Sequence, residues 1–253
     1  MIKLDGATVM LQWATGGLFF LWFTLRRGIV SVGYGWLLRS IYLVFAVASA
    51  FIGIRVDVVP LRDAMAILMA LATAAALVMS IVRRADEATA FPSPFDLVAP
   101  VLGIVGLLAA GVHAGDPALL SVVRTMVGAA FLGGVSDAML LGHWYLVQPG
   151  LSRAPLNELV RVVGLVWPLE VAALLWPIGM VSVINGSIDD GYAGLLGWFW
   201  IACAITTIVL IIVTRAALNE RSYSAVMAAT GLLYLAILTA FGTDLVARAV
   251  LAR

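Results

Sequence analysis

Ionisable side chains inside long apolar runs are the residues of this sequence most able to do chemistry. Arg39, Asp137, Arg161 and Glu170 each stand among hydrophobic neighbours. A charge at the middle of a bilayer costs about 2.5–3.5 kcal/mol or more, so it needs a function or a partner. These four residues predict a buried proton relay or an ion site. The alternative is a set of ion pairs that hold helices together.

The depth of each charge along its predicted helix limits which pairs can form. At a rise of about 1.5 Å per residue, Arg39, Asp137 and Arg161 fall at a similar depth, and Glu170 lies deeper. This geometry allows a pair between Asp137 and Arg161 and another between Glu170 and Arg39. Arg124 is expected to snorkel to the outer membrane surface instead.

A second candidate site combines Ser136, His143, Trp144 and Tyr145, close to the inner end of a long apolar run. Ser136 and His143 are seven residues apart and share one face of a helix. Histidine changes its charge near neutral pH and can donate, accept or ligate. The cluster would suit a quinone headgroup or a lipid phosphate. The alternative is an ordinary belt of aromatic residues at the membrane interface.

These residues must be positioned by helices that cross a membrane. Of the 253 residues, 63% are hydrophobic and 11% are charged, where a soluble domain carries about 25% charged residues. Apolar runs of roughly 20 residues recur, which is the length that crosses the hydrocarbon core. Because lipid cannot satisfy open backbone groups, the predicted fold class is an all-α integral membrane protein.

About eight transmembrane helices are predicted, in a single membrane domain that covers residues 1–253. Turn and breaker residues, such as Val59-Pro60 and Gln148-Pro149-Gly150, separate the apolar runs. The expected spans are residues 7–25, 30–54, 61–82, 95–113, 117–147, 156–184, 192–214 and 222–248.

A weak internal repeat suggests two tandem four-helix halves, residues 1–115 and 116–253. The pair Gly16-Gly17 in the first half resembles Gly133-Gly134 in the second, and Gly103 resembles Gly231. Two such halves in the same orientation are related by an axis along the membrane normal. The alternative is coincidence, because a sequence with few residue types produces such matches by chance.

Arginine placement predicts how the chain is oriented in the membrane. Alternate loops carry the arginines, and the intervening loops carry mostly acidic residues. The arginines of the alternate loops are Arg26, Arg27, Arg83, Arg84, Arg153, Arg215 and Arg221. The positive-inside rule places these loops in the cytoplasm of a bacterial inner membrane, so both termini are expected outside.

Several chemistries are excluded by composition and spacing. A net charge of +1 provides no basic field for nucleic acid. Lys3 is the only lysine and lies outside the spans, so no Schiff base to retinal is expected. Cys203 is the only cysteine, which excludes an intramolecular disulfide and a thiolate metal cluster. His113 and His143 fall near opposite membrane faces and cannot share a haem. Neither a metal nor a covalently bound cofactor is expected.

The leading functional hypothesis is a non-catalytic membrane subunit of a larger complex, such as a respiratory or electron-transfer complex. It would contact membrane lipids and other membrane subunits, with a quinone or lipid near His143. The alternative is a small proton-coupled secondary transporter that uses Asp137, Glu170 and Arg39. The sequence has no nucleophile–base or metal constellation that would favour an enzyme.

Overall fold

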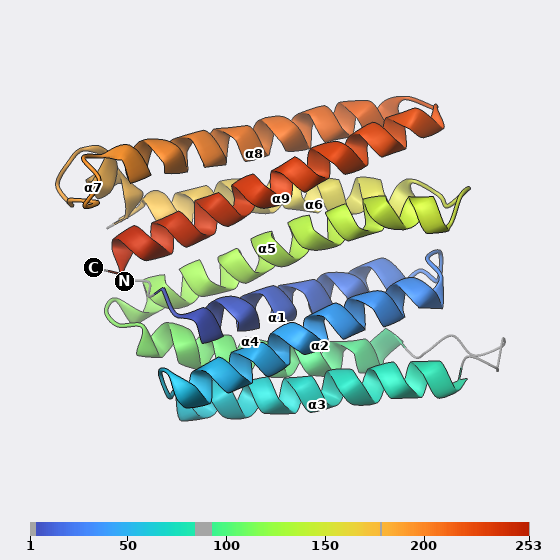
Figure 1. Cartoon of the computed structure of the whole chain (residues 1–253), viewed down its shortest axis with the longest axis horizontal. Helices are drawn as coiled ribbons and strands as arrows, with labels where there is room; N and C mark the ends of the chain where they lie inside the picture. The colour runs from blue at the N-terminus through green and yellow to red at the C-terminus, as the bar shows by residue number, and fades with distance from the viewer. Residues whose placement is uncertain (1–3, 84–92, 178, 253) are drawn as a thin grey trace.

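The computed structural model describes residues 4–83, 93–177 and 179–252 of the chain. It is 84% helical, with no strand in the described ranges. Two short elements accompany the long helices: the 3₁₀ turn η2 (Ser93–Leu97) before α4 and the helix α7 (Met180–Ile184) after α6. The long helices lie side by side along one axis (Figure 1): α1 (Gly6–Leu25), α2 (Val32–Arg55), α3 (Pro60–Val82), α4 (Val98–His113), α5 (Ala118–Val147), α6 (Ala154–Leu175), α8 (Leu195–Asn219) and α9 (Tyr223–Leu251).

Length and composition fit these helices to a membrane. Within the described residues, seven helices are long and apolar enough to cross a bilayer: α1, α2, α3, α4 with the end of η2, α5, α8 and α9. The helix α6 has 22 residues, a comparable length, but it contains Glu158, Arg161 and Glu170. The predicted all-α class is confirmed, and the seven apolar helices fit a multi-pass membrane protein.

The bundle is arranged in two groups of helices that meet through α1 and α5. Figure 1 shows α1 to α4 on one side, α6, α8 and α9 on the other, and α5 between them. The helix α5 contacts α1, α4, α6 and α9. The division into two halves, 1–115 and 116–253, stays a prediction, and so does the internal repeat.

Glycines permit the closest approach between α1 and α5. A Cβ atom added to Gly16 would overlap the carbonyl of Ala129, and one added to Gly133 would overlap the backbone of Gly16. Two helix backbones therefore touch here with no side chain between them. The glycine pairs that match in the sequence, Gly16-Gly17 and Gly133-Gly134, thus lie at this helix crossing.

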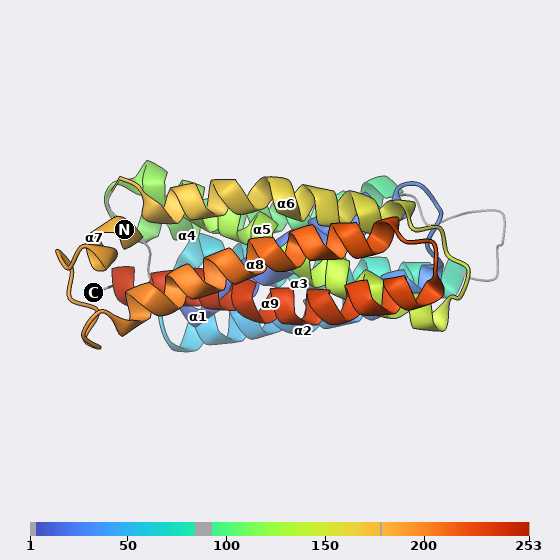
Figure 2. The ribbon, with the colours of Figure 1, turned by 90° about the horizontal axis from the view of Figure 1, so that it is seen from above.

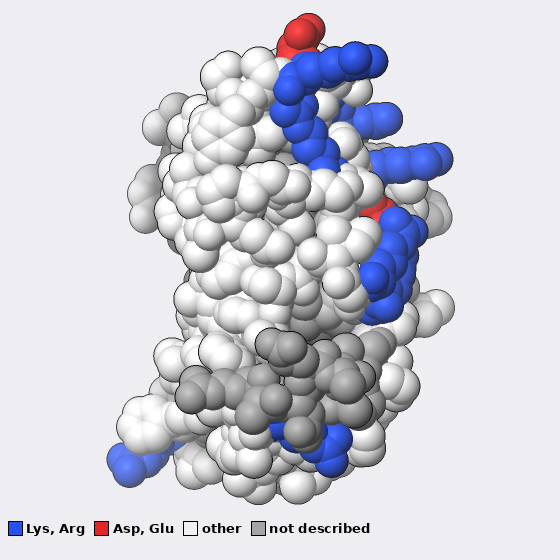
Figure 3. Space-filling view, turned by 90° about the vertical axis from the view of Figure 1, so that its right-hand side faces the viewer, with Lys and Arg blue, Asp and Glu red and all other residues white. Residues whose placement is uncertain are grey.

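The two described chain ends lie at the same end of the bundle, here called the terminal end (Figure 1). The loops that join α1 to α2, α5 to α6 and α8 to α9 lie at the opposite end, where arginine side chains gather (Figure 3). There Arg26 and Arg27 bond to Glu158 of α6 at 2.7 and 3.1 Å. Lys3 and Arg84, which entered the sequence argument, lie outside the described residues.

The predicted sixth span, residues 156–184, is wrong as a single helix. The helix α6 ends at Leu175, and Trp176 is extended, with φ −130° and ψ 152°. Pro177 has no N–H to continue the helix, and proline disfavours helical backbone in the residue before it. The chain then turns into the short helix α7, which Figures 1 and 2 both place at the terminal end.

Asp190 organises the loop that leads into α8. One carboxylate oxygen accepts from the backbone N–H of Tyr192 and Gly194, both at 2.9 Å. The other accepts from Leu196 at 2.8 Å and Gly197 at 3.4 Å. Desolvation acts to raise the pKa of Asp190, but these backbone donors outweigh it and hold that pKa below its ordinary value. The carboxylate also suits the positive N-terminal end of a helix.

Asp190→Asn is expected to loosen this loop at neutral pH. A carboxyl group whose pKa is lowered by folding stabilises the fold above its unfolded value of about 3.9. That contribution disappears as the pH falls through the lowered folded-state pKa. Hydrogen exchange of the amides at Gly194 and Leu196 should therefore be faster in the variant at pH 7. Equal protection of these amides in both proteins would show that the carboxylate does not order the loop.

Candidate functional site

Four buried charged side chains meet between α5, α6 and α9, and we call them the charge cluster. Arg124 comes from α5, Glu170 from α6, and Asp244 and Arg248 from α9; each is 0% exposed. Arg124 lies six residues into α5, or about 9 Å along the helix axis. The sequence predicted Glu170 as a buried charge, and its interpretation of Arg124 as a surface residue is wrong. Asp244 and Arg248 were not predicted.

Polar groups pack tightly where the cluster meets the backbone of α5. Arg248 Nε donates to Asp244 Oδ2 at 2.7 Å, one helical turn apart on α9. From α1, the amide of Gln12 donates to the carbonyl of Thr125 at 2.7 Å. A Cβ atom on Gly128 would lie 2.7 Å from Gln12 Nε2 and 2.9 Å from Asp244 Oδ1. Glycine at position 128 therefore lets these groups reach the helix backbone.

Glu170 and Asp244 form a pair of neighbouring carboxyl groups. Glu170 interacts electrostatically with Asp244, Arg248 and Arg124. Both buried oxygens of Glu170, and Asp244 Oδ1, lack a hydrogen-bond donor. Two ionised carboxylates are both acceptors, so they can bond to each other only when one carries a proton. The geometry therefore suits a carboxyl pair that shares one proton.

Arg124 connects the charge cluster to the end of α6. Its Nε donates to the carbonyl of Ala173 at 2.8 Å, two residues before the helix ends at Leu175. The last carbonyls of a helix have no donor within the helix, and a cation is favourable at that end. The same guanidinium interacts electrostatically with Glu170. Arg124 thus caps α6 and also supplies positive charge to the carboxyl pair.

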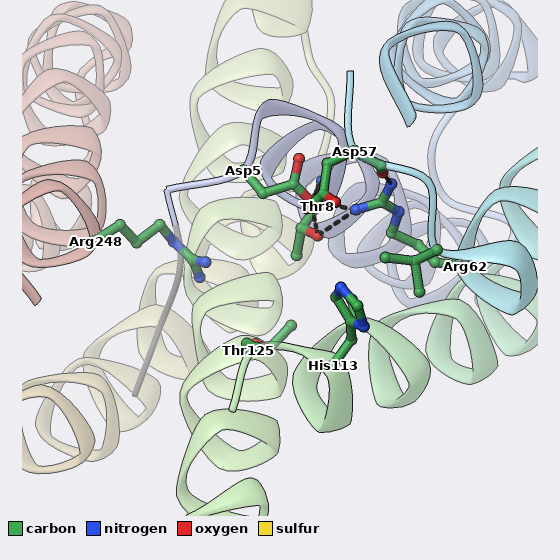
Figure 4. Close-up of a pocket in the computed structure, with 10 residues that line it drawn as sticks. Asp5, Thr8, Asp57, Arg62, His113, Thr125 and Arg248 are labelled. Carbon is green, nitrogen blue, oxygen red and sulfur yellow. Dashed lines mark hydrogen bonds and ion pairs between the residues drawn. The ribbon is translucent and has the colours of Figure 1, made fainter. Parts of the chain in front are cut away.

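A small pocket lies beside the cluster at the terminal end (Figure 4). Its volume of about 10 Å³ gives room for about one water molecule. Figure 4 shows Arg248 reaching toward the pocket from α9, with Asp5, Thr8 and Arg62 across from it and His113 alongside. Arg62 is held by Asp5 and by Asp63, the latter at 2.8 Å. The lining thus combines charged and hydroxyl side chains with the apolar residues Val59, Ala110 and Ala114.

Asp137 is buried at a different depth, about 20 Å from Arg124 along α5. The hydroxyl of Tyr42 donates to Asp137 Oδ1, and that of Tyr34 donates to the Asp137 carbonyl at 3.3 Å. Arg161 is exposed on α6. The predicted pair between Asp137 and Arg161 is therefore wrong, and so is the prediction that Arg161 is buried. Asp137 instead stays a candidate proton site beside a tyrosine.

Arg39 forms a buried bidentate ion pair with Asp96 of η2. Its Nη2 lies 2.7 Å from Asp96 Oδ1 and 2.8 Å from Oδ2, and its Nε lies 3.0 Å from Oδ1. The two side chains are 2% and 5% exposed. The predicted pair between Arg39 and Glu170 is wrong, because Glu170 lies in the charge cluster toward the terminal end. Arg39 lies about two helical turns from the start of α2, at the opposite end of the bundle.

The predicted site at Ser136, His143, Trp144 and Tyr145 is not a single pocket, because each side chain faces a different neighbour. Ser136 bonds to Trp13 at 2.7 Å, and His143 bonds to Tyr234 at 3.2 Å. Trp144 bonds to Ser31 at 3.3 Å and to Gln148 at 3.2 Å. Tyr145 bonds to the carbonyl of Ser152 at 2.6 Å. Ser136 and Tyr145 are buried, whereas His143 is exposed. One headgroup therefore does not contact all four residues, and quinone or lipid binding stays a prediction.

The fold and the charge cluster define a class: a helical multi-pass membrane protein with an internal carboxyl pair. Across the described ranges, no group of three or more His, Cys, Asp or Glu residues is placed to hold a metal ion. Comparison with known proteins finds no matching family, no matching curated protein and no matching solved structure.

Proposed function

We propose that this chain is a proton-linked membrane transport protein in which Glu170 and Asp244 bind one transferable proton. This is the proton-coupled transporter that the sequence left as the alternative. The observation that supports it is the fully buried Glu170, whose oxygens have no donor and whose neighbour is a second carboxyl group. A proton held between the two groups supplies the missing hydrogen bond.

The arginines make both states of such a site tolerable inside a membrane. With both carboxylates ionised, Arg124 and Arg248 leave the cluster neutral. With one proton bound, the cluster carries a single positive charge. A buried charge is costly unless it is paired, and here neither state leaves more than one charge uncompensated. Binding and release of one proton therefore avoid a large desolvation cost.

We also propose how the chain crosses the membrane. We take α6 as the eighth crossing, because its 22 residues match the neighbouring spans in length and both chain ends lie at the terminal end. The arginine-rich end then faces the cytoplasm of a bacterial inner membrane, with both termini outside. A membrane-impermeant reagent should label cysteines placed at either terminus of intact cells. Labelling of one terminus alone would overturn the even number of crossings.

Glu170→Gln tests the proton site directly. Infrared difference spectra of the purified protein in lipid nanodiscs should show a protonated-carboxyl band that Glu170→Gln or Asp244→Asn removes. In proteoliposomes with an internal pH-sensitive dye, the same variants should abolish protein-dependent proton flux, because the transferable proton has lost its site.

Two further variants make this test specific. Glu158→Gln, on the same helix but in the arginine-rich end, should leave the band and the flux unchanged. Asp137→Asn identifies any part of the band that comes from Asp137. If both cluster variants keep the wild-type band and flux, the proposal is wrong.

A second candidate function, the non-catalytic subunit of a larger membrane complex, is favoured by an apolar groove between α5 and α6. The groove has a volume of about 550 Å³ and is lined by side chains such as Leu120, Val123, Leu169 and Trp176. A helix of another subunit, or the chain of a lipid or quinone, would bury these residues. Purification in mild detergent should then retain a stoichiometric partner. A lone, monodisperse protein with proton flux would exclude this candidate.

A further inference from the structure

The pocket in Figure 4 lies where several helices end together. Its lining comes from the start of α1 (Asp5 and Thr8), the start of α3 (Arg62), the end of α4 (His113) and the end of α9 (Arg248). All these helix ends belong to the terminal end of the bundle. The pocket therefore lies close to the aqueous phase on that side, at the level where the helices leave the membrane.

Arg248 belongs both to the pocket and to the charge cluster. It lines the pocket, and its Nε pairs with Asp244 at 2.7 Å. Thr125, which also lines the pocket, accepts a hydrogen bond from Gln12 through its carbonyl. Arg248 is therefore the residue that joins the pocket lining to the carboxyl pair.

Unpartnered polar atoms lie between the pocket and Glu170. Arg248 Nη2, Asp244 Oδ1 and Gln12 Oε1 are buried and have no hydrogen-bond partner. All three side chains approach Gly128, where an added Cβ would lie 3.4 Å from Arg248 Nη2. Buried polar atoms of this kind are commonly satisfied by ordered water. These atoms supply unsatisfied donors and acceptors next to Arg248, which itself lines the pocket.

We propose that this pocket is the water-filled entrance through which protons from the terminal side reach the Glu170–Asp244 pair. The inference rests on the proposed proton site and adds the side from which that site is reached. A water in the pocket contacts the Arg248 region, and the proton passes through bound water to Asp244 and then to Glu170. The guanidinium of Arg248 stays protonated and orients Asp244, because arginine does not release its proton in proteins.

Filling the pocket tests the entrance without touching the carboxyl pair. Ala114 lines the pocket and is only partly buried, so Ala114→Leu adds volume at a tolerant position. After transfer of the full-length protein in nanodiscs into D₂O, the carboxyl band shifts as its proton exchanges. In Ala114→Leu this shift should be slower by about tenfold or more, because exchange then waits for local opening. The matched control is Ala109→Leu, within α4 and five residues before Ala114, which is the C-cap residue of that helix, and outside the pocket lining.

A second pair of variants covers the case in which Ala114→Leu does not fold. His113 is exposed at the pocket, so His113→Trp closes its mouth from the surface. Val112→Trp, at the neighbouring exposed position, is its control. The proposed entrance is supported if exchange is slower in the pocket variants and unchanged in their controls. If the folded pocket variants exchange at the wild-type rate, the proposed entrance is wrong, whereas the proposed proton site is unaffected. A carboxyl band that is absent from the wild type, or insensitive to Glu170→Gln, overturns the proposed function itself.

Discussion

Gly133→Ala is expected to destabilise the bundle by about 3 kcal/mol or more, the upper part of the range for overpacking. The new Cβ would overlap the backbone of Gly16, including its Cα and carbonyl carbon, and also the backbone N of Gly17. A backbone atom cannot move away by changing a rotamer, so α1 and α5 must separate along their crossing. Thermal unfolding in detergent micelles, followed by circular dichroism, measures the loss.

Gly231→Ala is the matched control for this substitution. Gly231 lies within α9, and a Cβ atom there meets no neighbouring atom within 4 Å. Alanine is favoured over glycine inside a helix by about 1 kcal/mol, so this variant should be as stable as the wild type or slightly more stable. If the two substitutions have the same effect, the contact between α1 and α5 does not depend on glycine.

Asp96→Asn is expected to cost about 3–5 kcal/mol of stability, the usual loss when one partner of a buried ion pair is removed. Asparagine keeps the shape of aspartate but leaves the buried Arg39 guanidinium without its counter-charge. The expected signs are a lower unfolding temperature in micelles and a lower yield of folded protein. The comparison variant is Glu158→Gln, whose side chain is 25% exposed in its pairs with Arg26 and Arg27. It should lose no more than about 1 kcal/mol.

The double variant Arg39→Met with Asp96→Leu separates charge from packing. Replacing both partners of a buried ion pair by apolar residues is often neutral or stabilising. The double variant should therefore recover most of the stability that Asp96→Asn loses. A double variant as unstable as the single one would mean that hydrogen-bond geometry, and not an uncompensated charge, explains the loss.

Hydropathy and breaker residues predicted the helices well, because each span is determined by local composition. The second span was expected at residues 30–54 and is Val32–Arg55; the fifth was expected at 117–147 and is Ala118–Val147. The sixth span failed at its end. Local composition stays apolar beyond Leu175, but Pro177 stops the helix. Proline is therefore a stronger signal for the end of this helix than the hydropathy of the residues that follow it.

The partners of the buried charges could not be predicted, because they depend on how each helix is rotated and which helix lies beside it. Asp137 was expected to pair with a charge, but the tyrosine hydroxyl of Tyr42 bonds to it. Asp96 was overlooked as a partner for Arg39 because it lies at the edge of a span. Depth along a helix limits the choices, but only tertiary packing selects among them.

Asp244 and Arg248 were missed for a different reason. The last span was expected to end at residue 248, which places Arg248 at the edge of the apolar run. The structure continues α9 to Leu251 and buries both residues completely. A usable signal was present: an acid and an arginine four residues apart inside an apolar run face the same side of a helix. That spacing predicts the pair between Asp244 and Arg248 within α9, whereas their meeting with Glu170 depends on tertiary packing.

Arg124 has a mechanical consequence that follows from its two contacts. Its guanidinium anchors the shortened end of α6, and it also faces the carboxylate of Glu170. Neutralising Glu170 would weaken its electrostatic attraction for Arg124. The guanidinium of Arg124 would then bind more firmly to the carbonyls at the end of α6. The same end of α6 borders the apolar groove through Ala173 and Trp176. Under the proposed function, binding of a proton at Glu170 would therefore act on the helix end that borders this groove.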